Sequence, residues 1–261
     1  MIVFHSDLDN TLIYSYKHDL GNEKRCVEIY QGREISFMTD KSFALLKEVY
    51  ERVLFVPTTT RTIEQYERIN LGIGIPRYAL VCNGGVLLID GKEDEAWYRE
   101  SLQMVSDCRS ELSRAEKCLE NDEYRNFEVR NIRNLFLFTK SAQPDQTVAM
   151  LKNILDLKLA DVFCNGMKVY VVPVKLNKGS ALQRFRNRVK VKGSVIIAAG
   201  DSEFDVSMLR EADLSIAPEG LARKYKIGNQ AAGVGENEIF SEKVLEHIIQ
   251  KGEEITAPLP L

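Results

Sequence analysis

The chain has 261 residues, of which 44% are hydrophobic and 28% are charged, and its formal net charge is -3. This composition excludes a largely disordered chain and predicts a folded protein of one large or two smaller domains. The small negative charge gives no electrostatic basis for binding nucleic acid or an acidic membrane surface.

The first third of the chain alternates apolar, strand-like runs with helical segments. Residues 1–6 have no polar alternation until their end, as in a strand buried on both faces of a parallel sheet. We expect helices at 43–49 and 63–71 and strands at 52–57 and 78–82. Residues 12–39 are too long for a plain connection, and two β-rich stretches around Gln31-Gly32-Arg33 predict a β-hairpin flap.

The middle of the chain, residues 86–174, has a different pattern. Asp90-Gly91 and Asn165-Gly166 predict two hairpins. Between them we expect helices at 101–120 and 146–156 and a strand at 135–139. We interpret this segment as an inserted α+β domain, which leaves a discontinuous core made of residues 1–85 and 175–261.

The last third returns to alternation. The expected elements are a helix at 178–189, a strand at 195–199, a helix at 204–211, a short strand at 214–217 and a closing helix at 241–250. Strands that alternate with helices predict an α/β fold with a doubly wound, Rossmann-like core around a parallel sheet.

The five cysteines are odd in number and show no CxxC spacing, which is typical of thiols in a reducing cytoplasm rather than of a disulfide framework or a zinc site. The first apolar run, residues 2–4, lacks a basic leader and is too short to span a bilayer. We therefore expect a cytoplasmic protein that does not bind membranes.

Asp7-Leu8-Asp9-Asn10-Thr11 follows the first predicted strand. In an extended chain the side chains of Asp7 and Asp9 point to the same side, outside the carboxyl edge of the sheet, where open α/β folds bind ligands. Two close carboxylates repel each other, and Mg²⁺ bound between them relieves that repulsion because it favours oxygen ligands and phosphate. The alternative interpretation is a helix cap or an acidic loop.

Polar residues also follow the predicted strand at 52–57. In Thr58-Thr59-Thr60-Arg61 a threonine hydroxyl suits a phosphoryl oxygen, and Arg61 is suited to pair with a phosphate. The alternative is that Thr60 only caps the next helix.

Two further segments complete the set. Lys178 opens a predicted helix, where a cation is unfavourable against the helix dipole unless an anion is near; a solvated surface lysine is the alternative. Gly200-Asp201-Ser202-Glu203-Phe204-Asp205 follows the strand at 195–199 and places Asp201 and Asp205 on one helix face. These two acids are a second source of metal ligands, or Asp201 or Ser202 is a helix cap.

Taken in order, D-x-D-x-T, Thr59, Lys178 and GD-x-x-x-D resemble the four motifs of the haloacid dehalogenase-like superfamily. The likeness extends over the whole chain, because residues 86–174 fall where that superfamily inserts its large α/β cap, and Asn83-Gly84 is similar to the step before that cap. Within the superfamily the chain is most similar to sugar-phosphate phosphatases of the sucrose-phosphatase and phosphomannomutase type.

The resemblance implies a magnesium-dependent phosphatase for a small phosphorylated metabolite, expected to be a sugar phosphate. By position, Asp7 would be the nucleophile and Asp9 the general acid and base. The implied metal site comprises Asp7, the backbone carbonyl of Asp9, Asp201 and Asp205, the last directly or through waters. The residues implied in binding phosphate or substrate are Thr59, Arg61, Asn83 and Lys178.

Two residues depart from the pattern of these relatives. Thr60 stands where they usually have glycine, and Phe204 stands where they often have asparagine. A sugar phosphomutase on the same fold is the main alternative function, and a catalytically silent binding module is a second. The oligomeric state is left open by the sequence.

Overall fold

The computed structural model describes residues 1–190, 193–235 and 238–256. The chain forms two compact units, one from Met1–Glu93 with Lys178–Leu261 and the other from Asp94–Asn177. In the described ranges, no helix combines the length and the apolar character needed to cross a membrane. The assignment of a discontinuous catalytic core and an inserted cap, with limits at 85/86 and 174/175, stays a prediction.

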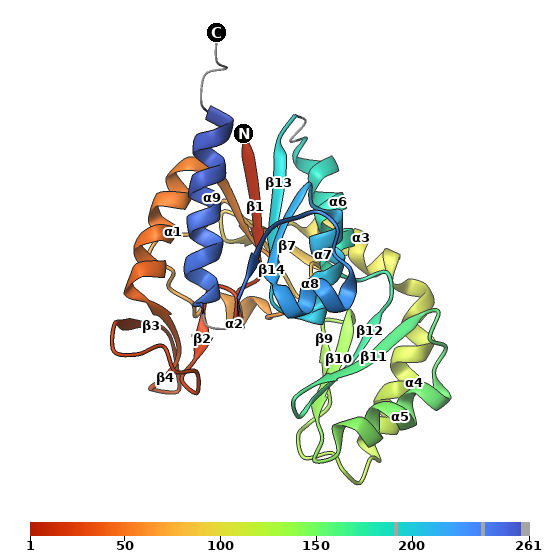
Figure 1. The fold of residues 1–261 in the computed structure, drawn as a ribbon. Helices are drawn as coiled ribbons and strands as arrows, with labels where there is room; N and C mark the ends of the chain where they lie inside the picture. Colours follow the sequence, from red (N-terminus) through yellow and green to blue (C-terminus); the bar gives the residue numbers. More distant parts are fainter. Residues whose placement is uncertain (191–192, 236–237, 257–261) are drawn as a thin grey trace. The chain divides into compact units, whose positions relative to one another are not determined.

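A five-stranded parallel sheet forms the centre of the first unit, in the order β15-β14-β13-β1-β5 (Figure 1). Its strands are β1 (Ile2–Ser6), β5 (Leu54–Pro57), β13 (Val195–Ala199), β14 (Leu214–Pro218) and β15 (Gln230–Val234). Every residue of β1 is buried, as expected for a strand paired on both sides. The chain adds β5 on one side of β1 and β13 on the other, so ligands are expected at the carboxyl ends of these strands. The predicted α/β fold class is confirmed.

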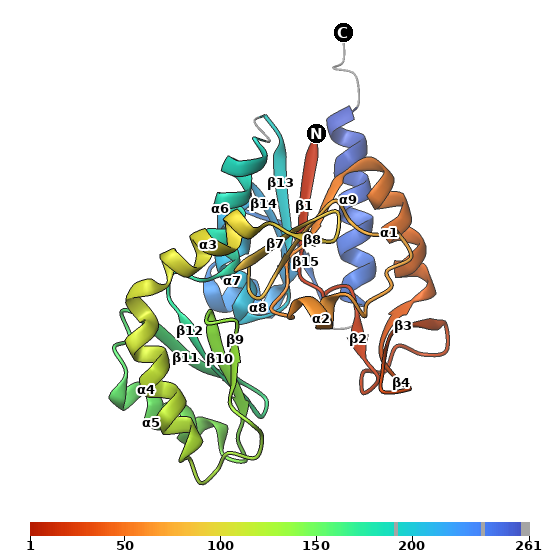
Figure 2. The same ribbon diagram turned by 180° about the vertical axis from the view of Figure 1, so that it is seen from behind.

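Helices cover both faces of this sheet. The helices α1 (Asp40–Arg52) and α9 (Phe240–Thr256) lie together on one side, and α6 (Lys178–Val189) and α7 (Val206–Glu211) lie on the other (Figures 1 and 2). A 3₁₀ turn, Glu203–Asp205, leads into α7, and α8 (Glu219–Tyr225) follows β14. Helix α1 begins where the Thr39 hydroxyl oxygen accepts the backbone N–H of Ser42, which satisfies one of the unpaired amides of the first turn.

The predicted flap is a three-stranded antiparallel sheet in the order β2-β4-β3. Its strands are β2 (Tyr14–Ser15), β3 (Lys24–Tyr30) and β4 (Arg33–Thr39). Gln31 and Gly32 both have positive φ, 51° and 74°, which matches the twist of a two-residue hairpin turn. The β3–β4 register is irregular on both sides of Glu28, a β-bulge that changes the direction of a side chain.

A second hairpin, extended by a short third strand, forms a separate antiparallel sheet beside the main sheet. It comprises β6 (Tyr78–Val81), β7 (Val86–Ile89) and β8 (Lys92–Glu93). Residues 86–93 group with the first unit through the pairing of β7 with β6. A parallel bridge between Thr58 and Leu80 connects this hairpin with the segment after β5.

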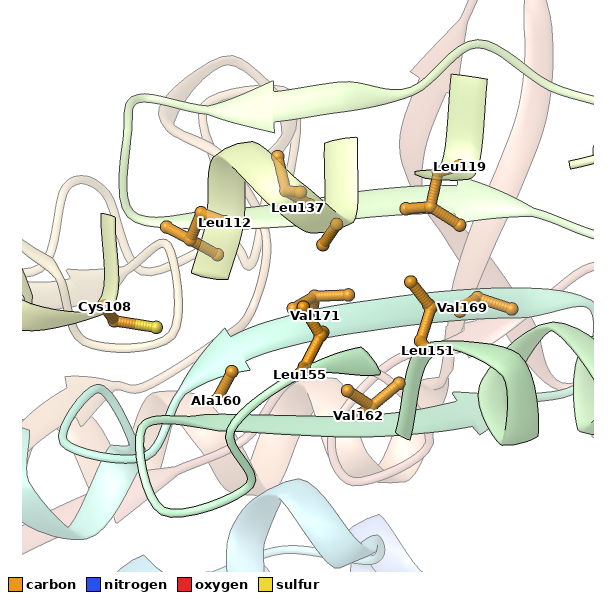
Figure 3. Close-up of a cluster of buried hydrophobic side chains, with 11 residues drawn as sticks. Cys108, Leu112, Leu119, Leu137, Leu151, Leu155, Ala160, Val162, Val169 and Val171 are labelled. Carbon is orange, nitrogen blue, oxygen red and sulfur yellow. The ribbon is translucent and has the colours of Figure 1, made fainter. Parts of the chain in front are cut away.

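The second unit is an antiparallel sheet, in the order β11-β12-β10-β9, with helices on one face. Its elements are α3 (Glu95–Met104), a 3₁₀ turn (Ser106–Cys108), α4 (Arg109–Glu120), β9 (Arg130–Ile132), β10 (Phe136–Lys140), α5 (Pro144–Ile154), β11 (Ala160–Asn165) and β12 (Lys168–Pro173). Side chains from α4, α5 and three strands form its buried core (Figure 3).

Two of the predicted helices are shortened or interrupted in the structure. The segment expected to be helical over 63–71 contains only the single turn α2 (Ile63–Tyr66). Beyond it, Ile69 bridges to Glu28 and the Asn70 N–H donates to the Val27 carbonyl at 2.8 Å, so the backbone pairs with the flap instead of continuing the helix. The helix expected over 101–120 is interrupted by the 3₁₀ turn at Ser106–Cys108.

Candidate active site

Asp7 follows β1 directly, at the carboxyl edge of the parallel sheet. Its backbone N–H donates to the carbonyl of Ala199, the last residue of β13, at 2.9 Å. Asp7 is 6% exposed. Burial raises the pKa of the Asp7 carboxyl well above its ordinary value, although the ammonium of Lys178 opposes that rise.

Lys178, the first residue of α6, is 1% exposed, which excludes the solvated surface lysine. Its Nζ lies 2.6 Å from Asp7 Oδ1 and 2.6 Å from Asp205 Oδ1. Burial alone would lower the pKa of Lys178, but the two carboxylates raise it above its ordinary value. The anionic partner expected from its place at a helix N-terminus is therefore a pair of aspartates.

The turn after β13 supplies the other carboxylates. Asp201 Oδ1 accepts the Thr11 hydroxyl at 3.1 Å, while Asp205 Oδ2 accepts the N–H and the hydroxyl of Ser202. A Cβ on Gly200 would lie 2.3 Å from the Asp205 Cβ, so glycine is required there. Burial first, and then the charge of Asp205, raises the pKa of Asp201 to about 7.

The three aspartates fit a divalent cation. Asp7, Asp201 and Asp205 each offer a carboxylate oxygen, and these oxygens lie within 4.8 Å of one another. When all are ionised, the Lys178 ammonium offsets only one of the three negative charges. Carboxylate oxygens are the ligands that Mg²⁺ prefers in proteins. These three side chains are therefore the ones that would hold a magnesium ion.

The carboxylate of Asp9 points to a different partner. The extended chain expected through Asp9 ends in a turn that begins at Leu8, whose carbonyl accepts the N–H of Leu12 at 2.9 Å. Asp9 then lies beside Arg61, with Oδ1 2.7 Å from Nη2 and Oδ2 2.7 Å from Nε. The role of the Asp9 backbone carbonyl as a metal ligand stays a prediction.

Arg61 joins two carboxylates. Besides Asp9, its Nη1 lies 2.8 Å from Glu28 Oε2 and donates to the carbonyl of Gln65 at 3.3 Å. Burial alone would lower the pKa of Arg61, but the carboxylates of Asp9 and Glu28 raise it above its ordinary value. In this structure the Arg61 guanidinium binds Asp9 and Glu28. The expected contact of Arg61 with a phosphate stays a prediction.

The remaining phosphate-binding candidates lie on two loops joined by backbone hydrogen bonds. Thr59, fully buried, donates its N–H to the Leu80 carbonyl at 2.8 Å and accepts the Asn83 N–H at 3.0 Å. Asn83 has a φ of 57° in the turn between β6 and β7. The helix cap expected at Thr60 is instead formed by Thr62, whose hydroxyl accepts the Gln65 N–H.

Glu28 and the hydroxyl of Thr11 are two groups near the site that were not among the predicted site residues. Thr11 belongs to the D-x-D-x-T motif, so the motif itself carried a signal for it. Glu28 carried none, because its burial depends on the bulge in β3 and on contacts with residues far away in the sequence.

The chain is similar to known proteins in sequence and in fold. The sequence profile of the haloacid dehalogenase-like hydrolase family matches residues 93–220. A phosphoglycolate phosphatase from Sulfurisphaera tokodaii is 24% identical over 225 residues, which cover 81% of this chain and 88% of that protein.

Solved structures share the fold. The sucrose-phosphatase of Synechocystis, solved with sucrose and phosphate, has a TM-score of 0.66 at 18% identity, over 95% of this chain and 97% of that one. A haloalkanoate-superfamily phosphatase from Bacteroides thetaiotaomicron has a TM-score of 0.54 at 16% identity, over 95% of each chain. The chain is thus similar in sequence to haloacid dehalogenase-like hydrolases over residues 93–220, and it shares its fold with these phosphatases over most of its length.

Proposed function

We propose that this protein, a phosphatase of the haloacid dehalogenase-like family, hydrolyses a small phosphorylated metabolite through an aspartyl-phosphate on Asp7, with Mg²⁺ bound by Asp7, Asp201 and Asp205. The observation that carries the proposal is the contact of Asp7 Oδ1 with the buried Lys178 ammonium at 2.6 Å, with two more carboxylates within 4.8 Å. A carboxylate nucleophile, a fixed cation and a set of metal ligands are what such phosphoryl transfer uses.

In this proposal, Asp7 attacks the phosphorus atom through a carboxylate oxygen, and the bond from phosphorus to the leaving oxygen breaks. Asp9 gives that oxygen a proton, then takes a proton from the water that attacks the aspartyl-phosphate. Inorganic phosphate leaves and the Asp7 carboxylate is restored.

Fixed charges support the transfer. Lys178 is held in place by Asp7 and Asp205 before substrate arrives, so it needs no reorganisation to stabilise negative charge that develops on the phosphoryl oxygens. Thr59, at the end of the neighbouring strand, is the proposed hydroxyl for a phosphoryl oxygen. Bound Mg²⁺ would supply further positive charge at the transferred group.

The contacts of Asp9 with Arg61 support its proposed role as a base. Both of its oxygens accept N–H groups of Arg61, and charge-assisted pairs of this kind favour the ionised carboxylate. The Asp9 side chain is 47% exposed, which gives it room to turn. Proton donation to a leaving group then requires Asp9 to part from at least one Arg61 nitrogen.

The proposed substrate class is a small phosphate monoester, with sugar phosphates first. Support comes from the shared fold with a sucrose-phosphatase and from the 24% identity to a phosphoglycolate phosphatase. A cytoplasmic location is part of the proposal, and it is supported by the free thiols of Cys26, Cys108, Cys118 and Cys164.

A phosphate-release assay on a panel of sugar phosphates, phosphoglycolate and p-nitrophenyl phosphate tests the activity. We expect release with Mg²⁺ and none after chelation by EDTA. A bisphosphate activator added to a hexose phosphate separates hydrolysis from a mutase reaction, because a mutase would form the isomeric phosphate instead of free phosphate. No release from any ester would refute the proposed function.

The nucleophile is tested separately with Asp7→Asn. We expect its kcat to fall by about 10³-fold or more, because the neutral amide cannot form the phospho-enzyme. Borohydride reduction of wild-type protein during turnover should convert residue 7 to homoserine, which peptide mass spectrometry detects. Exposed Asp161→Asn is the control and should keep full activity. Homoserine at another aspartate would contradict the assignment.

A further inference from the structure

Glu28 is a fully buried carboxylate that the proposed reaction does not use. It lies on β3 of the flap, and its side chain is 0% exposed although it is charged. Oε2 accepts the Ser36 hydroxyl at 2.6 Å and contacts Arg61 Nη1 at 2.8 Å. Oε1 contacts Arg68 through Nη2 at 3.1 Å and Nε at 3.2 Å. A buried charge is tolerated only when it is paired and hydrogen-bonded in this way.

Through Arg61, Glu28 is connected with Asp9. The Arg61 side chain is 13% exposed, and its Nη1 faces Glu28 while its Nε and Nη2 face Asp9 at 2.7 Å each. A guanidinium is planar and rigid, so fixing one edge fixes the direction of the others. The position of Arg61 therefore depends on Glu28, and the position of Asp9 depends on Arg61.

The backbone supports the same connection. The bulge at Glu28 interrupts the β3–β4 pairing, and Glu28 forms an antiparallel bridge with Ile69 instead. Val27 accepts the Asn70 N–H at 2.8 Å. The flap and the segment after α2 are thus joined by main-chain and side-chain contacts around this carboxylate.

We propose that Glu28 is a positioning residue: it holds Arg61 in the orientation in which the guanidinium places the Asp9 carboxylate. The catalytic part of this inference rests on the proposed function, in which Asp9 transfers protons. With Arg61 anchored by Glu28, Asp9 is able to part from the guanidinium while the guanidinium stays in place. Without Glu28, Arg61 keeps only Asp9 as a carboxylate partner in this network and moves with it, so Asp9 is misplaced for proton transfer.

The first experiment needs no activity. Arg61 Nε–Hε is recorded by ¹⁵N NMR, assigned by its loss in Arg61→Lys, and its hydrogen exchange with solvent is measured in Glu28→Gln. We expect at least about tenfold faster exchange, because the Arg61–Asp9 contact opens more often. The matched control is Glu34→Gln, which removes the same charge from an exposed position of the same hairpin and should leave the rate unchanged. An unchanged rate in Glu28→Gln overturns the proposal.

The second experiment is a double-mutant cycle with Mg²⁺ and the best ester of the panel. We expect Glu28→Gln to lower kcat by about 10- to 100-fold, as for a misplaced catalytic group, with a KM within about threefold. In an Asp9→Asn background the same change should cost nothing further, because its effect passes through Asp9. Losses that multiply in the double variant would instead indicate a general structural role and overturn the proposal.

Glu28→Asp covers the case in which Glu28→Gln fails to fold. It keeps the charge but shortens the side chain, so we expect an exchange rate and a kcat between those of wild type and Asp9→Asn, with a thermal midpoint near that of Glu34→Gln. Wild-type values of both quantities in a folded Glu28→Asp would count against the proposal. If wild-type protein releases no phosphate from any ester, the proposed function fails, while the exchange rate of Arg61 still decides whether Glu28 positions it.

Discussion

Lys178 and the acidic side chains around it show how single residues set the charge of this site. Asp7 and Asp205 both contact its ammonium at 2.6 Å, whereas Asp201 is bound by the Thr11 hydroxyl. Asp201 thus accepts a hydrogen bond from a neutral hydroxyl, whereas Asp7 and Asp205 contact the lysine ammonium. Burial, and then the charge of Asp205, raise the pKa of Asp201 to about 7, and the Thr11 hydroxyl and Lys178 offset this only in part.

This raised pKa has a definite effect on stability. The ordinary value for Asp201 is 3.8 and the folded value is about 7, so between these pH values the folded protein binds a proton that the unfolded chain has lost. The contribution of Asp201 to the free energy of unfolding is therefore fully present below about pH 4, and it is lost as the pH rises through about 7. His5 acts in the opposite sense, because burial lowers its pKa to about 3.

The contribution of Asp201 is therefore measured as a difference from Asp201→Asn. Without metal, we expect the thermal midpoint of wild type relative to this variant to fall by several degrees between about pH 5 and about pH 8. Added Mg²⁺ should raise the wild-type midpoint at the higher pH and leave the variant nearly unchanged, because the ion binds the carboxylate. A difference that stays constant with pH would contradict the assignment.

At the scale of elements, the turn from β13 into α7 positions two of the proposed metal ligands, Asp201 and Asp205. Gly200 lets the chain pass so close to Asp205 that an added Cβ would lie 2.3 Å from the Asp205 Cβ and 2.8 Å from its Oδ2. Asp205 in turn closes the turn by accepting two hydrogen bonds from Ser202. The spacing GD-x-x-x-D thus reflects a steric requirement as well as a set of ligands.

Gly200→Ala tests this turn. We expect it to displace Asp205 and to weaken Mg²⁺ binding, measured by titration calorimetry, by about tenfold or more, as changes next to metal ligands often do. Gly220→Ala is the matched control, since no atom lies within 4 Å of its added Cβ. Equal metal affinity in the two variants would show that the turn tolerates a side chain.

At the scale of the molecule, each unit has a core of its own. In the second unit Leu151 of α5 is fully buried among Leu119, Leu137 and Val171 (Figure 3). The candidate catalytic residues belong to the first unit. Packing of this kind makes the unit dependent on its own side chains for stability.

Leu151→Ala should lower the free energy of unfolding by about 2–5 kcal/mol, because it removes buried methyl groups and leaves a cavity. Urea denaturation measures this. Ile154→Ala, on the same helix but 38% exposed, should change stability by less than about 1 kcal/mol. Since the site residues all belong to the first unit, Mg²⁺ affinity should be equal in both variants; a selective loss in Leu151→Ala would contradict this independence.

The sequence by itself determined the alternation of elements and the residues at the ends of the core strands. Buried parallel strands appear in the sequence as continuous apolar runs. Acidic residues, threonine and lysine next to such runs are easily recognised, because they interrupt the apolar pattern. Asp7, Lys178, Asp201 and Asp205 were identified in this way, and the structure brings them together. Short elements such as β9 and β15 give too weak a periodicity and were not predicted.

Only the tertiary structure decided the partners of Asp9, Arg61 and Glu28. The carboxylate of Asp9 pairs with Arg61, and the bulge at Glu28 buries a carboxylate that strand alternation does not single out. The shortened α2 has the same origin, since its following residues pair with the flap. The charged partners of Asp9, Arg61 and Glu28 come from segments about 30 to 50 residues away in the chain, and such contacts leave no periodic trace in a single sequence.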